Sequence, residues 1–105
     1  MKLDIEISEE FEFSQIVNVF ENRGLKVCFV CTGNTCRSPM AAAVLNQYGK
    51  KYDISAVSAG LFPHVGDPIS ENAAIALKKN NIIVPDHFAK IIDEETVKEC
   101  DKIIV

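Results

Sequence analysis

The sequence has no apolar run close to the roughly 20 residues that a helix needs to cross a bilayer. It also lacks internal repeats, low-complexity segments and any excess of positive charge: it has 11 Lys and Arg residues against 15 Asp and Glu residues, a formal net charge of -4. That balance argues against nucleic-acid binding and against a basic membrane-binding patch. With 48% hydrophobic and 25% charged residues, the 105-residue chain has the composition of one small globular domain.

The first residues lack the features of a secretory signal peptide. Residues 1–6 alternate between apolar and charged side chains, without the apolar segment that a signal peptide needs. We therefore expect a cytoplasmic protein, in which thiols stay reduced by default.

The cysteines lack the arrangement of a structural zinc site. Cys28 and Cys31 have Cys-x-x-Cys spacing, but no second pair follows, and neither histidine stands at ligand spacing from a cysteine. On a strand, these two side chains would point to opposite faces. We expect no metal, and we expect Cys28 and Cys100 to fill the core as small apolar residues.

The most informative stretch is residues 26–41, which reads as a strand, a loop and the start of a helix. Val27–Cys31 is apolar and rich in β-branched and aromatic residues, as a buried strand is. Thr32–Thr35 is small, polar and contains a glycine, which is typical of a loop. Pro39 stands in the first turn of an alanine-rich segment, where its missing N–H costs nothing. Such a strand–loop–helix unit holds anions, because N–H groups converge at the helix N-terminus.

Two side chains turn this anion site into a candidate reaction centre. Cys31 ends the predicted strand, and a thiol beside a helix N-terminus and a guanidinium loses its proton easily to become a nucleophile. Arg37 offers a planar fork that matches two phosphate oxygens. This chemistry needs only a thiolate and hydrogen-bond donors, so we expect no cofactor.

The string Cys31-Thr-Gly-Asn-Thr-Cys-Arg-Ser-Pro39 resembles the active-site signature of the low-molecular-weight protein phosphatases, a family that includes thioredoxin-coupled arsenate reductases. Residues 57–60, 86–90 and 101–105 also resemble later parts of the family pattern. The resemblance covers residues 25–105 and implies an α/β fold: a three-layer, Rossmann-like open parallel sheet with helices on both faces, incomplete at its C-terminal edge.

The resemblance also implies the roles of the loop residues. Cys31 would attack phosphorus and carry a phosphocysteine intermediate, while Arg37 and the backbone N–H groups of the loop would bind the phosphoryl oxygens. Ser38 would donate its hydroxyl to the thiolate, cap the helix, or do both. The expected substrate-binding loop residues are Thr32, Gly33, Asn34, Thr35 and Cys36.

Four further side chains carry expectations. Ser58 and His87, together with Asn34, match family positions that brace the loop through hydrogen bonds. Phe62 follows the second strand and either forms a wall of the substrate pocket or packs within its own loop. Cys36 either forms a reversible disulfide with Cys31 or is a small residue that fits the loop.

The pattern predicts the element order β-α-β-α-α-β. Strands are expected at 27–31, 52–58 and 102–105, with helices beginning at Ser38, over 70–79 and over 94–99 with Val97 and Cys100 facing inward. Residues 1–24 form an extension before the family pattern, with a possible strand at 3–7 and a possible helix at 14–23. Its apolar face is expected to cover this domain, a partner or a neighbouring domain.

The family pattern continues past Val105 with another strand, a terminal helix and an Asp-Pro loop that carries the general acid. Asp67, in the pair Asp67-Pro68, does not fall at the matching place. We therefore expect a fragment of a longer enzyme, an enzyme completed by another chain, or a phosphate-binding module without turnover. The exposed sheet edge and the extension are candidate sites of self-association or of a partner chain.

The expected partners are a phosphorylated protein or a small phosphoester, with inorganic phosphate as product or inhibitor. Family members that act on phosphotyrosine often have a bulky aliphatic residue where this chain has Thr35, and members that act on phosphoarginine have threonine there. A small hydroxyl-bearing side chain leaves room and a partner for a guanidinium nitrogen. An arsenate reductase is a further alternative, but it needs another redox cysteine pair, and only Cys100 is present beyond the loop.

Overall fold

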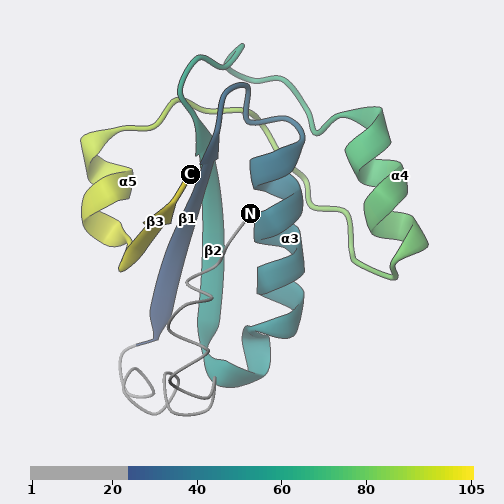
Figure 1. Ribbon diagram of the computed structural model, residues 1–105, viewed down its shortest axis with the longest axis horizontal. Coiled ribbons are helices and arrows are strands. Elements are labelled where there is room, and N and C mark those ends of the chain that lie inside the picture. Colours follow the sequence, from purple (N-terminus) through teal and green to yellow (C-terminus); the bar gives the residue numbers. More distant parts are fainter. Residues whose placement is uncertain (1–23) are drawn as a thin grey trace.

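The computed structural model describes residues 24–105, which form a parallel sheet of three strands covered by helices (Figure 1). The central strand is β1 (Leu25–Cys31), with β2 (Ile54–Gly60) on one side and β3 (Lys102–Ile104) on the other. The strand and helix suggested at 3–7 and 14–23 lie outside the described residues.

The helices lie on both faces of the sheet. Helix α3 (Arg37–Tyr48) covers one face, and the short helix α5 (Glu94–Glu99) lies on the other side of the sheet (Figure 1). Helix α4 (Glu71–Lys79) packs beside α3. The predicted three-layer α/β architecture is thus confirmed. Within residues 24–105, no helix combines the length and the apolar character needed to cross a membrane.

The second strand begins two residues later than the sequence suggested. Tyr52 ends a 3-10 helix (η1, Lys50–Tyr52), and Asp53 takes a left-handed conformation with φ of 58°. The N–H of Asp53 closes this turn on the carbonyl of Lys50 at 3.1 Å. The strand then runs on to Gly60, which pairs in register with Cys31, so both strands end at the same edge of the sheet.

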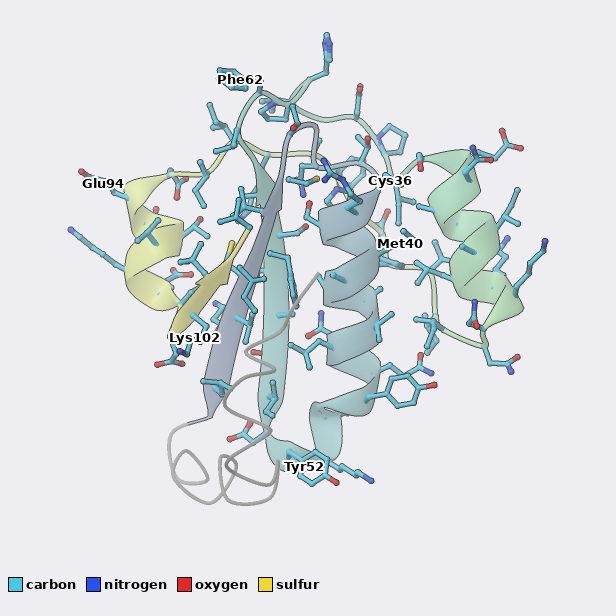
Figure 2. The ribbon with its side chains drawn as sticks, in the orientation of Figure 1. Cys36, Met40, Tyr52, Phe62, Glu94 and Lys102 are labelled. Atoms are coloured by element: carbon cyan, nitrogen blue, oxygen red, sulfur yellow. The ribbon has the colours of Figure 1, made fainter. Side chains whose placement is uncertain are left out.

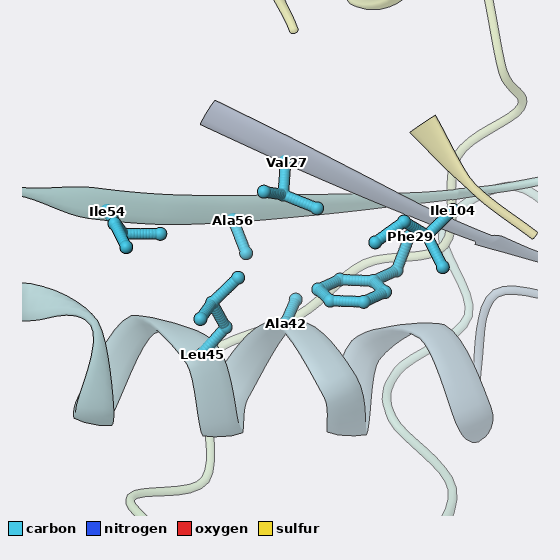
Figure 3. Packing of buried hydrophobic residues seen from close by; sticks show 7 residues of the cluster. All are labelled: Val27, Phe29, Ala42, Leu45, Ile54, Ala56 and Ile104. Atoms are coloured by element: carbon cyan, nitrogen blue, oxygen red, sulfur yellow. The ribbon is translucent and has the colours of Figure 1, made fainter. Parts of the chain in front are cut away.

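The main core lies between the sheet and α3 (Figure 3). Phe29 is 2% exposed and reaches from β1 toward Ala42 of α3 and Ile104 of β3. The full cluster consists of Val27, Phe29, Ala42, Leu45, Ile54, Ala56 and Ile104. Alternation along β1 sends Cys28 and Val30 to the opposite face, where they form a second cluster with Ala59.

The two later helices begin at the side-chain caps that the sequence indicated. Ser70 Oγ accepts the N–H of Ala73 at 3.2 Å, and Asp93 Oδ1 accepts the N–H of Thr96 at 2.8 Å. One orientation was predicted wrongly: Val97 is 47% exposed, and Thr96 is the residue of α5 that is buried. Lys90 Nζ lies 3.5 Å from the Thr96 hydroxyl, so the buried side of this short helix carries a polar contact.

Candidate active site

The candidate site lies where β1 ends and α3 begins. Cys31 is the last residue of β1, and Arg37 is the first residue of α3. Figure 2 shows Cys36 and Phe62 at this same end of the molecule and Tyr52 at the opposite end. The residues between Cys31 and Arg37 form a tight turn, which we call the phosphate loop (residues 31–37).

Five carbonyl groups of the phosphate loop point outward into the surrounding protein. Four of these carbonyls, those of Cys31, Thr32, Thr35 and Cys36, accept backbone N–H groups from other parts of the chain at 2.7–3.1 Å. The fifth, that of Asn34, accepts from the His87 ring at 2.6 Å. In a trans peptide, a carbonyl and the following N–H point in opposite directions. The five N–H groups that follow these carbonyls are therefore turned away from the surrounding protein. They belong to Thr32, Gly33, Thr35, Cys36 and Arg37.

Asn34 makes the turn possible. Its φ is 55°, in the left-handed region that asparagine tolerates better than most residues. The side chain is completely buried, and its Nδ2 donates to Ser38 Oγ and to Ser58 Oγ, both at 2.9 Å. Its Oδ1 accepts the backbone N–H of Lys90 at 2.9 Å. The Asn34 side chain is thus committed to bonds within the protein, and its peptide shapes the loop.

His87 holds the same residue from the other side. Its Nε2 lies 2.6 Å from the Asn34 carbonyl oxygen. A carbonyl oxygen only accepts, so Nε2 carries the proton in this contact. Three chain segments therefore converge on Asn34: α3 through Ser38, β2 through Ser58, and the loop that carries His87 and Lys90.

The Cys31 thiol is placed to become a thiolate. Its Sγ lies 3.0 Å from Ser38 Oγ, which already accepts from Asn34 and so has its own hydrogen free to donate to sulfur. Burial raises the pKa of Cys31. The hydrogen bonds from the Ser38 hydroxyl and from the N–H groups of Ser38 and Asn34, together with the charge of Arg37, outweigh this, so that the pKa lies below the ordinary thiol value.

Ser38 does not cap α3. The N-cap residue is Cys36, and the cap has no side-chain hydrogen bond. Of the two roles suggested for Ser38, the structure shows only the hydroxyl contact with the thiol.

The close approach of Gly60 to the phosphate loop did not emerge from the sequence. A Cβ atom on Gly60 would lie 2.9 Å from the Thr32 carbonyl oxygen and 3.0 Å from the Asn34 Cβ. The N–H and carbonyl of Gly60 are also bonded, to the carbonyl of Lys90 and the N–H of Ile92. The sequence feature that could have indicated this contact is a glycine at the end of the strand that pairs with β1.

The remaining predicted residues lie around the loop opening. Arg37 and Cys36 are exposed, and Thr35 is partly buried. Phe62 is 81% exposed, and its N–H donates to the Thr32 carbonyl, which places its backbone against the loop. A groove of about 470 Å³ runs past Cys31 and Arg37 between β1 and α3, with Met40 and Val105 also in its lining. In the described part of the chain, no three His, Cys, Asp or Glu side chains gather in a group that could hold a metal ion.

Comparisons with known proteins agree with this geometry. Residues 26–105 match the family model described as low molecular weight phosphotyrosine protein phosphatase. The low molecular weight protein-tyrosine-phosphatase Ptp of Acinetobacter johnsonii is 35% identical over 79 residues, covering 75% of this chain and 54% of its own. Arsenate reductase 1 of Bacillus cereus is 37% identical over 79 residues, covering 74% and 55%.

A solved structure gives the same match in three dimensions. The arginine phosphatase YwlE of Geobacillus stearothermophilus superposes with a TM-score of 0.68 and is 35% identical, covering 75% of this chain and 50% of its own. The chain spans about half the length of the curated relatives it matches.

Proposed function

Because the chain belongs to the low molecular weight phosphotyrosine protein phosphatase family, we propose that it hydrolyses phosphorylated protein residues at the phosphate loop. The observation that supports this best is the combination of a hydrogen-bonded thiol of lowered pKa with five peptide N–H groups turned away from the surrounding protein. A thiolate is a strong nucleophile, and fixed donors stabilise charge that develops on phosphoryl oxygens.

In this proposal, Cys31 attacks phosphorus and expels the leaving group, which leaves a phosphocysteine that water then hydrolyses. The Arg37 side chain binds two oxygens in a bidentate manner, and the backbone N–H groups of Thr32, Gly33, Thr35, Cys36 and Arg37 bind the others. Ser38 stabilises the thiolate, and Ser58 and His87 position Asn34. Inorganic phosphate is the product and a competitive inhibitor. The catalytic domain begins near residue 25, and residues 1–24 are an extension to it.

We infer a preference for phosphoarginine within this family. Thr35 offers a small hydroxyl-bearing side chain at the loop, which leaves room for a guanidinium nitrogen and gives it a hydrogen-bond partner. Phe62 provides an exposed ring that can pack on a planar guanidinium. The relatives include proteins named for tyrosine and for arginine phosphatase activity.

We also propose a cytoplasmic location and an assembly through the edge of the sheet. A reduced thiol nucleophile suits the cytoplasm, where glutathione and thioredoxin keep cysteines reduced. Among the described residues, β2 and β3 are the outer strands of the three-stranded sheet. An edge of this kind supports self-association or pairing with a partner chain.

Phosphate release from p-nitrophenyl phosphate tests the main proposal. This ester has a good leaving group, so its hydrolysis depends little on a general acid. We expect sustained release that Cys31→Ser abolishes and that Arg37→Lys lowers roughly 100-fold, because a lysine cannot reproduce the two-point contact. Cys100→Ser, which changes a thiol on the other face of the sheet, should retain turnover.

The same assay separates an enzyme from a binding module. A single burst of one phosphate per chain, or no release while inorganic phosphate still binds, would favour a phosphate-binding module. Should turnover occur, phosphoarginine and phosphotyrosine peptides compared at equal concentration test the preference, and Thr35→Ile should shift the ratio toward phosphotyrosine. Arsenate reduction coupled to thioredoxin, without phosphate release, would overturn the proposal in favour of a reductase.

A further inference from the structure

A second pair of thiols lies on the face of the sheet opposite the phosphate loop. Cys28 is in the middle of β1 and completely buried, and Cys100 is the partly buried residue that ends α5. Both belong to one apolar cluster with Val30 and Ala59, to which Val57 and Ile92 add. The proposed hydrolysis uses neither thiol.

Cys28 and Cys100 are neighbours in this apolar cluster. Burial raises the pKa of Cys28 to about 11, and the charge of an ionised Cys100 adds to this rise. Burial also raises the pKa of Cys100, although the charge of Lys26 opposes the rise. The shared cluster places the two side chains beside each other on this face of the sheet.

Regular structure fixes this arrangement, rather than a loop. Cys28 pairs in register with Ile103 of β3. The N–H of Asp101 donates to the Lys26 carbonyl at 2.7 Å, and the N–H of Lys26 donates to Asp101 Oδ2 at 2.9 Å. These bonds hold the residue after Cys100 against the residue two before Cys28, so both thiols start from well-defined backbone positions.

We propose that Cys28 and Cys100 are a modification site that forms an intramolecular disulfide when the protein meets a hydroperoxide. The Cys100 thiolate attacks the peroxide oxygen, which gives a sulfenic acid and releases one molecule of water or alcohol. The Cys28 sulfur then attacks the sulfenic sulfur, forms the S–S bond and expels water. Two thiols are oxidised and one peroxide is reduced, so atoms and electrons balance.

Exposure sets the order of events at this pair. Cys100 is partly exposed and Cys28 is not, so the peroxide reaches Cys100 first. The charges of Lys26 and Lys90 favour the thiolate form of Cys100, whereas the charge of Glu99 opposes it. Near Cys28, the charge of Lys90 favours ionisation of the thiol and the charge of Asp93 opposes it. Oxidation here should be slower than at Cys31, whose thiol ionises more readily.

The disulfide would join the strand that carries the nucleophile to the junction between α5 and β3. In the reduced protein, β3 is held to β1 by backbone pairing over three residue pairs. A covalent link at this point should hold the last strand in place when the rest of the domain begins to open. The pair is therefore expected to stabilise the oxidised fold, independently of whether the phosphate loop catalyses hydrolysis.

The test uses the full chain with Cys31→Ser and Cys36→Ser, so that only the two thiols of interest remain. The protein is exposed to hydrogen peroxide, denatured, alkylated with iodoacetamide and weighed by mass spectrometry. We expect both thiols to be lost together with a mass decrease of two hydrogens, and dithiothreitol to restore them. Adding Cys100→Ser, at the more tolerant partly exposed position, should leave Cys28 free to be alkylated.

Thermal unfolding provides a second readout that needs no catalytic activity. The oxidised form should unfold at a higher temperature than the reduced form, and dithiothreitol should reverse the shift. Oxygen addition to Cys100 with Cys28 still alkylatable, disulfide-linked dimers, or two unchanged thiols after overnight exposure would each overturn the proposal.

Discussion

Ser38 is the single residue whose hydroxyl most directly affects the ionisation of Cys31. Its hydroxyl contacts the Cys31 thiol at 3.0 Å and helps to lower the pKa of Cys31. Ser38→Ala removes a donor to the thiolate, so the pKa should rise and fewer thiols should be ionised at neutral pH. We expect slower alkylation of Cys31 by iodoacetamide at pH 7 and a reactivity profile moved to higher pH.

Ser55→Ala is the matched control for this prediction, because Ser55 is exposed on β2. Its profile should overlay that of the unaltered protein. Identical profiles for both variants would show that the N–H groups and Arg37 alone determine the ionisation of Cys31.

Asn34 contributes to stability as well as to the site. Asn34→Ala removes a buried side chain that makes three hydrogen bonds and leaves the Ser58 hydroxyl and the Lys90 N–H without this partner. Alanine also tolerates positive φ less well than asparagine. We expect a loss of roughly 2 kcal/mol in the free energy of unfolding, measured by urea denaturation, and weaker binding of inorganic phosphate by calorimetry.

Asn72→Ala, on the exposed surface of α4, is the corresponding control. It should change stability by no more than about 0.5 kcal/mol. An Asn34→Ala protein with unaltered stability and unaltered phosphate affinity would show that the loop keeps its shape without these bonds.

At the level of elements, α4 depends on Ser70 for its start. The Ser70 hydroxyl caps the helix, while its backbone N–H donates to the Thr35 carbonyl at 2.7 Å and so links the helix to the phosphate loop. Ser70→Ala should cost about 1 kcal/mol of unfolding free energy. Ser70→Asn, which retains a capping oxygen, should recover most of that loss; equal losses for both would assign the effect to something other than the cap. Chemical denaturation followed by circular dichroism measures both variants.

The elements were largely predictable because their signals are local. A cap and an apolar helical face predicted α4, and Asp93 predicted the start of α5. The start of β2 was missed because Tyr52 has high strand propensity, while the tertiary fold places it in a 3-10 turn closed by Asp53. The orientation of Val97 was missed for a similar reason, since a six-residue helix has too few residues to define its buried side from the sequence.

The site was predictable only in its side chains. Cys31, Arg37 and Ser38 stand in a recognisable string, and the structure places them together at one sheet edge. The backbone N–H of Lys90 and the bare Cα of Gly60 are equally part of the loop's surroundings. Neither is visible in the sequence, because every residue has a backbone N–H and a glycine has many possible reasons to be present.

At the level of the whole molecule, stability rests on the layer between the sheet and α3. Phe29 is the large buried side chain that joins β1, β3 and this helix (Figure 3). Phe29→Ala should cost about 4 kcal/mol, a large share of the 5–15 kcal/mol typical of a domain. Urea denaturation should give a midpoint well below that of the unaltered chain. Phe62→Ala changes the same residue type at an exposed position and should move the midpoint little; equal shifts would contradict the assignment of the core.

The outward carbonyls of the phosphate loop have a thermodynamic consequence for selectivity. The surrounding protein already holds this ring of peptides in shape, so the N–H donors are arranged before an ion binds. Binding would therefore carry little entropic cost for ordering the loop. Under the proposed function, such a rigid ring distinguishes ions by charge, size and tetrahedral geometry, and not by the element at the centre. Phosphate, arsenate and vanadate should therefore compete on nearly equal terms for entry, and discrimination among them falls to the chemistry that follows binding.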